Sequence, residues 1–238
     1  MNNILDPNIW SYETLEDGTL EITGYNGNET DVTIPEGVTS IGSEAFTWCD
    51  HLTSIQIPKS VTTIGDDAFY HCENLTSVTI PDSVTTIGNC AFGWCKNLTN
   101  ITLPAGTISI HPDAFSWCKA LVEEIADEHG FAIMKDILIG YTGSGGNVIL
   151  PAGITAIGAW SFYECCGLTS IALPEGITAI GSRAFWGCER LTSITIPAGV
   201  TSIGDSAFKW CESLTICGVP GSCAETYAKA NRIPFAIL

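Results

Sequence analysis

Residues 52–74 read LTSIQIPKSVTTIGDDAFYHCEN, and residues 75–97 read LTSVTIPDSVTTIGNCAFGWCKN. The two segments agree at most positions, so the chain repeats itself with a period of 23 residues. The prolines show the same spacing in two series, Pro35, Pro58, Pro81 and Pro104, and then Pro151, Pro174 and Pro197. A period of about 20 to 30 residues is typical of stacked coils, each of which buries its apolar side only against its neighbours. We therefore expect a repeat solenoid that is mainly β in content.

Each repeat begins with a segment that predicts a short β-strand. In residues 52–58 the side chains of Ile55 and Ile57 point to one face of an extended chain, and Gln56 points to the other. Stacked copies are expected to pair in parallel at a spacing of about 4.8 Å. Pro58 ends the strand because proline donates no hydrogen bond to a neighbouring strand, and the residues after it supply a turn.

The second half of the repeat predicts a corner. A short extended segment, Val-Thr-x-Ile-Gly, ends at glycines such as Gly65, which we expect to adopt a positive φ angle. The following Ala-Phe-x-x-Cys motif is expected to form one helical or 3₁₀ turn that buries Ala68, Phe69 and Cys72. The equivalent phenylalanines should then stack into a buried spine, formed by Phe46, Phe69, Phe92, Phe115, Phe162, Phe185 and Phe208.

The cysteines follow the same period. Eleven cysteines would ordinarily suggest a disulfide framework. Seven of them, however, lie three residues after the phenylalanine, at Cys49, Cys72, Cys95, Cys118, Cys165, Cys188 and Cys211. Free cysteine packs as a small apolar residue, so this position predicts a buried column of thiols. Because the total is odd, at least one thiol stays unpaired within the chain.

The chain is strongly acidic. Its 238 residues contain 26 Asp and Glu but only 9 Lys and Arg, which gives a formal net charge of −17. Such a surface repels phosphate backbones and anionic lipid headgroups, so we expect no nucleic acid partner. No apolar run approaches the length of a membrane span, and the first residues lack the features of a signal peptide. We therefore expect no direct membrane insertion.

Continuous repeats favour a single structural domain with three parts. Residues 1–34 are expected to form an N-terminal β cap, residues 35–216 the solenoid, and residues 217–238 a C-terminal cap. An irregular coil at about residues 122–150 replaces a regular repeat, and we expect the stack to continue through it.

Local patterns predict the elements of the caps and of the irregular coil. Residues 10–15 and 19–24 are expected to form a hairpin that covers the first coil. A capping box that begins at Ser222 predicts a short helix, followed by a last strand. In the irregular coil, residues 131–141 predict a second hairpin, and the glycine-rich residues 143–147 predict a loop.

Two sets of side chains are candidates for contact with a partner. The outward strand positions form the usual ligand face of a repeat protein, and the candidates there are Gln56, Thr79, Thr102 and Thr195. Their alternative role is a polar ladder that only suits β-structure. The aromatic residues of the Ala-Phe-x-x-Cys motifs form the second set, which contains Trp48, Tyr70, Trp94, Trp117, Tyr163, Trp186 and Trp210. These rings are expected to line a partly solvated ribbon that favours protein or sugar contacts, or else to seal the edge of the coils by packing on one another.

The sequence shows no catalytic apparatus. The four histidines are scattered along the chain, at His51, His71, His111 and His129. None of them is spaced to work with a nucleophile and an acid. A zinc cluster of His71 and Cys72 with Cys90 and Cys95 would consume two core positions, and no calcium-binding loop motif occurs. We therefore expect no enzyme activity, no metal site and no cofactor.

The repeat Leu-Thr-Ser-Ile-x-Ile-Pro-x-x-Val-Thr-x-Ile-Gly-x-x-Ala-Phe-x-x-Cys resembles the BspA-like leucine-rich repeat family, over seven units from Pro35 to Leu214. The resemblance implies a leucine-rich-repeat stack of parallel short strands. Many members of that family are secreted or surface-displayed proteins of bacteria, and some are described as adhesins that bind host proteins or other cells. The resemblance therefore implies an extracellular or cell-surface location, with a protein or glycan partner on a host or neighbouring cell surface.

Two cysteines near the end of the chain stand apart from the thiol column. Cys217 and Cys223 lie six residues apart, where similar terminal segments of the family tend to carry tyrosines. They are candidates for a disulfide if the chain is exported, although spacing alone does not define a pairing.

These observations lead to a noncatalytic binding or adhesion module of a cell-surface or secreted protein, which presents an extended solenoid surface to its partner. The alternative is a rigid structural spacer of a larger surface protein, with no ligand of its own. The constant outward Thr and Ser residues favour the spacer, whereas the aromatic ribbon favours binding.

Overall fold

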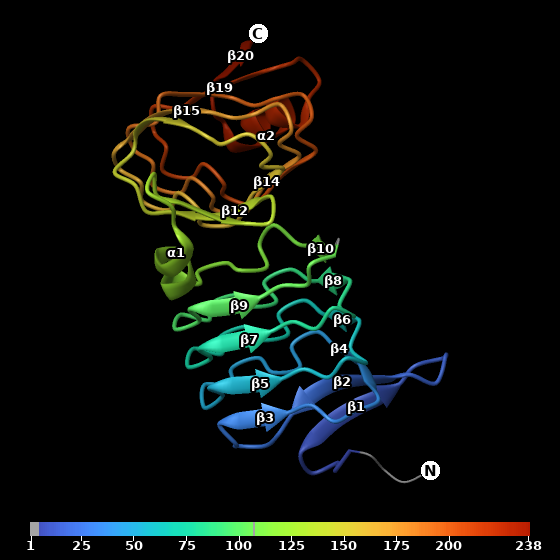
Figure 1. The fold of residues 1–238 in the computed structure, drawn as a ribbon. Helices are drawn as coiled ribbons and strands as arrows, with labels where there is room; N and C mark the ends of the chain where they lie inside the picture. The colour runs from blue at the N-terminus through green and yellow to red at the C-terminus, as the bar shows by residue number, and fades with distance from the viewer. Residues whose placement is uncertain (1–4, 107) are drawn as a thin grey trace. The chain divides into compact units, whose positions relative to one another are not determined.

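The computed structural model describes residues 5–106 and 108–238. Short β-strands dominate this part of the chain, and its two helices contain seven and nine residues (Figure 1). The chain divides into two compact units, which meet in the sequence between Glu124 and Ile125. Within each unit, strands that lie one repeat apart in the sequence are neighbours in parallel ladders. The predicted repeat solenoid of short parallel strands is therefore confirmed.

Unit 1 contains two ladders. One is a parallel sheet of β3 (Asp31–Thr33), β5 (Ser54–Gln56), β7 (Ser77–Thr79) and β9 (Asn100–Thr102). The other starts from the antiparallel hairpin of β1 (Trp10–Thr14) and β2 (Leu20–Tyr25) and continues through β4 (Val38–Ile41), β6 (Thr63–Ile64), β8 (Thr86–Ile87) and β10 (Ser109–Ile110). Paired residues such as Ile55 and Val78 are 23 positions apart. Like positions of successive repeats therefore lie over one another.

Unit 2 repeats this plan. One ladder starts from the antiparallel hairpin of β11 (Phe131–Met134) and β12 (Ile137–Tyr141) and continues through β14 (Ala156–Ile157), β16 (Ala179–Ile180) and β18 (Ser202–Ile203). The other consists of β13 (Gly146–Ile149), β15 (Leu168–Ala172), β17 (Ser193–Thr195), β19 (Thr215–Gly218) and β20 (Phe235–Ile237). Helix α2 (Cys223–Asn231) precedes the last strand.

The predicted caps are confirmed in outline. The hairpin of β1 and β2 has the expected position, and its own residues Trp10 and Ile22 are buried. Ser222 is the N-cap of α2, where its side chain accepts a hydrogen bond from the N–H of Glu225. The first four residues of the predicted N-terminal cap lie outside the described residues.

The irregular coil differs from its prediction in two details. The hairpin over residues 131–141 is present, but β13 already begins at Gly146, inside the segment predicted as a loop. In addition, helix α1 (Lys119–Ile125) was not expected, although Lys, Ala, Leu and Glu are good helix formers. Its Leu121 is buried. Continuity of the stack through residues 122–150, and hence a single domain, stays a prediction.

The corner between the second strand and the cysteine is built differently from the prediction. None of the glycines such as Gly65 has a positive φ. Instead, left-handed residues occur two positions after the glycine, as at Asp67 (φ 53°), and directly before the cysteine, as at His71 (φ 60°). Bonds such as Tyr70 N–H to Asp67 C=O and Cys72 N–H to Phe69 C=O show the spacing of a 3₁₀ turn, but the alternating φ angles prevent a continuous helix.

The phenylalanine spine is confirmed within each unit. In unit 1 the ring centroids of Phe46 and Phe69 are 5.0 Å apart, and those of Phe69 and Phe92 are 5.1 Å apart. In unit 2 the rings of Phe185 and Phe208 are also 5.1 Å apart. These phenylalanines are at most 2% exposed. The spine therefore forms the centre of each core.

The thiol column has a hydrogen-bonding role besides packing. The thiols of five column cysteines donate to the carbonyl of the phenylalanine in the preceding repeat, as from Cys72 to Phe46 at 3.1 Å and from Cys95 to Phe69 at 3.2 Å. Burial raises the pKa of the Cys118 thiol to about 12. All eleven cysteines are free in this structure, so the column is a structural feature of the coil edge.

Candidate functional site

A row of four rings lies on the corner of unit 1. Its members are the residues directly before the cysteines of successive repeats, Trp48, His71, Trp94 and Trp117. The centroid distances are 3.8 Å between Trp48 and His71, 5.1 Å between His71 and Trp94, and 5.2 Å between Trp94 and Trp117. The first two pairs are stacked, and the last is tilted by 31°. We call this row the aromatic corner of unit 1.

The backbone explains why the rings stack. All four residues have φ angles of 60° or 61°. The N–H of Trp48 donates to the carbonyl of Tyr70 in the next coil at 2.9 Å, and the N–H of Trp94 donates to Ser116 at 2.8 Å. These bonds hold the corner residues at the spacing of the coils. A left-handed conformation costs an L-residue roughly 1 to 2 kcal/mol, which the bonds between coils and the ring contacts offset.

Charged groups border this row. The ammonium group of Lys96 lies 2.6 Å from the Glu73 carboxylate and 5.5 Å from the centroid of Trp94. The same carboxylate lies 3.2 Å from Nδ1 of His71. Lys96 holds the pKa of Glu73 below its usual range. Trp48 is the first ring of the row and is 60% exposed. The other three rings are half-buried.

The corner of unit 2 alternates rings with cations. The guanidinium of Arg183 lies 5.0 Å from the centroid of Trp160 and 5.8 Å from that of Trp186. The ammonium of Lys209 lies 4.9 Å from Trp186 and 5.7 Å from Trp210. Trp210 is 55% exposed. We call these five residues the aromatic corner of unit 2. Three of the nine basic residues of this acidic chain therefore contact tryptophan rings.

The structure places the remaining predicted aromatic residues beside these corners. Tyr70 meets Trp48 edge-on at 6.2 Å, and Tyr163 meets Trp160 edge-on at 5.0 Å. The sequence prediction missed His71 and Trp160, together with both cations of unit 2. The repeat spacing could have identified His71, because this residue occupies the same repeat position as Trp48 and Trp94.

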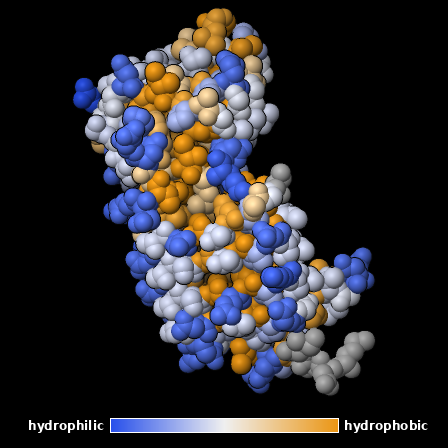
Figure 2. All heavy atoms as spheres, viewed as in Figure 1, coloured by the Kyte–Doolittle hydropathy of each residue, from blue (hydrophilic) through white to orange (hydrophobic). Residues whose placement is uncertain are grey.

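Three of the four predicted strand-face residues come together in unit 1. Gln56, Thr79 and Thr102 line a hollow of about 780 Å³, together with Lys59 and Asp82. Thr195 lies in the other unit, on β17, and is exposed. On the face shown in Figure 2, apolar surface forms a central band in each unit, and hydrophilic side chains gather along its margins. The hollow is open, and apolar residues such as Ile57 and Leu103 contribute to its lining, which suits a weak, extended contact.

The other candidate groups lie apart. Cys217 lies in β19 and Cys223 is the first residue of α2; both thiols are free in this structure, so their disulfide stays a prediction. Among residues 5–106 and 108–238, no group of three His, Cys, Asp or Glu side chains is arranged to hold a metal ion. No helix in the described part of the chain is long and apolar enough to cross a membrane.

The parallel ladders, the 23-residue register and the buried phenylalanine spine define a leucine-rich repeat module. The chain belongs to the family of the BspA type leucine rich repeat region, whose model matches residues 24–135 and 140–230 in six copies. Comparison with curated proteins finds no match.

Solved structures of similar proteins agree with this assignment. A leucine-rich cell surface protein from Faecalibacterium prausnitzii is 34% identical, with a TM-score of 0.51, over 90% of this chain and 54% of the other. This chain thus spans about half the length of that protein. The leucine-rich repeat protein of T. pallidum is 25% identical, with a TM-score of 0.53, over 98% of this chain and 97% of the other. A leucine-rich repeat protein from Eubacterium ventriosum has 23% identity and a TM-score of 0.51 over 92% and 72% of the two chains, and shares the fold.

Proposed function

We propose that this chain is a noncatalytic binding module of a cell-surface or secreted protein, and that its aromatic corners hold a protein or glycan partner. The observation that carries the proposal is the exposure of Trp48 and Trp210, at 60% and 55%, within ordered rows of rings and cations. Burial of apolar surface yields about 25 cal/mol per Å², and a ring already fixed by its neighbours loses little entropy on binding. Tryptophan and arginine are also the residues that most often dominate binding interfaces.

One similar protein supports the proposed location on a cell surface. The similar protein from Faecalibacterium prausnitzii is described as a cell surface protein. None of the three similar structures is described as an enzyme. A repeat module that presents a fixed row of side chains on a rigid frame fits an extracellular binding role.

A spacer without a ligand is the second candidate, and one observation favours it. The hydroxyls of Thr53, Thr76 and Thr99 each donate to a backbone carbonyl of the preceding coil, at 3.0 to 3.3 Å. These threonines serve the stack itself. The half-burial of Trp94 and Trp117 also gives those rings a packing role.

The two functions are separated by a capture experiment with the purified chain on arrays of extracellular-matrix proteins and glycans. The matched variant carries Trp48→Asn and Trp210→Asn, because asparagine tolerates the left-handed backbone of both positions. We expect saturable capture of at least one partner by the natural chain and a loss of roughly tenfold or more in the variant, with the melting temperature nearly unchanged.

A Gln56→Ala variant serves as the control, because it alters the strand face of unit 1 and leaves both corners intact. Capture that is equal in all three proteins would move the contact away from the corners. The absence of saturable capture by the natural chain on either array would support the spacer.

A further inference from the structure

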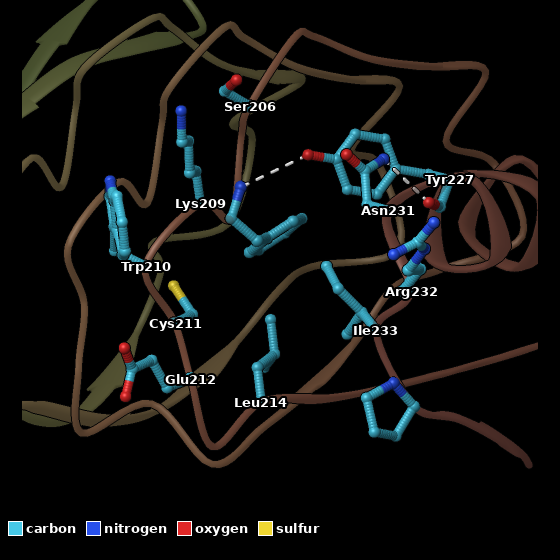
Figure 3. A pocket seen from close by; sticks show the side chains of 12 residues that line it. Ser206, Lys209, Trp210, Cys211, Glu212, Leu214, Tyr227, Asn231, Arg232 and Ile233 are labelled. Atoms are coloured by element: carbon cyan, nitrogen blue, oxygen red, sulfur yellow. Dashed lines mark hydrogen bonds between the residues drawn. The ribbon is translucent and has the colours of Figure 1, made fainter.

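The last coil of unit 2 ends in a cavity of about 370 Å³ between its corner and helix α2. Figure 3 shows Lys209 and Trp210 along one side, and Tyr227, Asn231 and Arg232 on the other. Leu214, Ile233 and Pro234 add apolar surface. This volume lies at the lower end of the range of about 300 to 1,000 Å³ that is typical of small-molecule sites. It suits a single ring rather than a long chain.

The cavity exists because the stack stops there. In unit 2, the N–H of Glu164 donates to Trp186 of the next coil at 2.7 Å, and the N–H of Gly187 donates to Lys209 at 2.9 Å. Trp210 is the next residue of this series, but no acceptor for its N–H is found in the part of the chain that the structure describes. The equivalent bond of Phe208 is replaced, since its N–H donates to the hydroxyl of Tyr227 at 3.4 Å. The corner therefore presents an unused backbone donor to the cavity.

The side chains around this donor are also rich in donors. Lys209 and Arg232 have no carboxylate within 4 Å among residues 5–106 and 108–238. One amide hydrogen of Asn231 is used on the Tyr227 carbonyl at 2.9 Å, which leaves its second hydrogen and its oxygen available. Glu212 is the acidic residue of the lining and supplies an acceptor. An anion fits this set, because Arg forms paired hydrogen bonds with planar carboxylates.

We propose that this cavity binds a carboxylated sugar residue. The exposed ring of Trp210 provides a flat surface for the C–H face of a pyranose. Arg232, Lys209 and the N–H of Trp210 hold the carboxylate, while Asn231 and Glu212 hydrogen-bond the hydroxyls. The remote acidic residues of the chain repel such a ligand only weakly, since screening limits their field to about 8 Å at physiological salt. This inference rests on the proposed function, because Trp210 belongs to the aromatic corner of unit 2.

The test is a titration of the ¹⁵N-labelled chain with glucuronic acid and N-acetylneuraminic acid, followed by NMR. We expect saturable shifts of the Trp210 backbone and indole N–H signals for at least one of the two acids, with a Kd on the order of 1 mM that rises with added salt. Glucose, which lacks the carboxylate, and acetate, which lacks the ring, should each bind at least roughly tenfold more weakly.

Two variants locate the site. Arg232→Asn keeps a residue that tolerates the left-handed C-cap and removes the charge, and Trp210→Asn removes the ring; each should weaken binding of the acid by roughly tenfold. Arg190→Asn is the matched control: it removes the same charge at an exposed position of unit 2 that lies outside both the cavity lining and the aromatic corner, and it should leave the affinity unchanged. Equal binding of acetate or glucose, an affinity that survives Arg232→Asn, or no saturable shift with either acid would overturn the proposal. Array capture that depends on Trp48 would still support the proposed function in that case.

Discussion

Gly65 shows what the repeat requires of a single residue. Its φ is not positive, but a Cβ added to it would lie 2.7 Å from the backbone nitrogen of Ser43 and 2.8 Å from the carbonyl carbon of Gly42. These atoms belong to the preceding coil. The glycine therefore permits the close approach of two backbones. The residue with the left-handed conformation is Asp67, two positions later.

Replacement of this glycine should therefore separate two coils. Gly65→Ala is expected to destabilise unit 1 by about 1 to 3 kcal/mol, because backbone atoms cannot move as freely as a flexible side chain. Gly176→Ala is the matched control, since its Cβ would meet nothing closer than 3.7 Å. Urea unfolding curves of both variants give the comparison. Equal stability of the two variants would show that the coils tolerate the extra carbon at residue 65.

The thiol column makes stability depend on pH in the alkaline range. Burial raises the pKa of Cys118 to about 12 and that of Cys95 well above its usual value of 9.0. The unfolded chain thus loses these protons at a lower pH than the folded chain does. Stability from this source is complete below about pH 9 and falls as the pH rises toward the pKa of the folded state.

We expect the free energy of unfolding to fall by about 1.4 kcal/mol per pH unit for each such thiol above pH 9. Urea unfolding at pH 8, 9.5 and 10.5 measures the slope. The variant Cys118→Ala provides the comparison, because it lacks one titrating group and should show a shallower decline. Identical slopes in the two proteins would show that the thiol column does not cause the loss of stability at alkaline pH.

At the scale of elements, α2 completes the last coil without repeating it. The Tyr227 hydroxyl takes the place of the next coil's carbonyl for Phe208, and the Tyr227 ring meets the Phe208 ring edge-on at 5.8 Å. Ala224 and Ala228 are the buried residues of the helix. The helix ends at Arg232, whose left-handed backbone lets its N–H reach the carbonyls of Ala228 and Lys229.

The start of this helix gives a direct test of the cap. Ser222→Ala removes the hydroxyl that accepts from Glu225 at 3.3 Å and should cost about 1 kcal/mol. Ser222→Asp keeps an acceptor at the N-cap and should retain natural stability. Chemical denaturation measures the free energy of unfolding of the two variants. An equal loss of stability in both would mean that the hydroxyl has no capping role.

At the scale of the whole molecule, the sequence predicts what repeats and misses what does not. The period defines the ladders, the phenylalanine spine and the thiol column, because equivalent residues of successive coils meet the same surroundings. Helix α1 was missed because residues 119–125 fall where the repeat breaks down, so only weak intrinsic propensity marks them. Trp160 was missed for a different reason. It occupies the same repeat position as Arg183, 23 residues later, and a ring and a cation at one position do not look like a repeated motif.

The same reasoning predicts how strongly a spine residue supports the stack. Phe69 is fully buried between Phe46 and Phe92, so Phe69→Ala should cost about 3 to 5 kcal/mol. That loss exceeds what one coil is expected to add, so unit 1 should unfold at a markedly lower temperature. Gln56→Ala, at an exposed position, should change stability by less than about 0.5 kcal/mol. Similar melting temperatures for the two variants would contradict the spine.

Every proposal above depends on residues 23 positions apart lying over one another within each unit. The most direct measurement is an NMR experiment for through-space contacts between phenylalanine ring protons in the folded chain. We predict cross-peaks between Phe69 and Phe92 and between Phe185 and Phe208, whose ring centroids are 5.1 Å apart in both pairs. Assigned rings that show no such contacts, or ring protons that show contacts with water instead, would contradict the stacked arrangement.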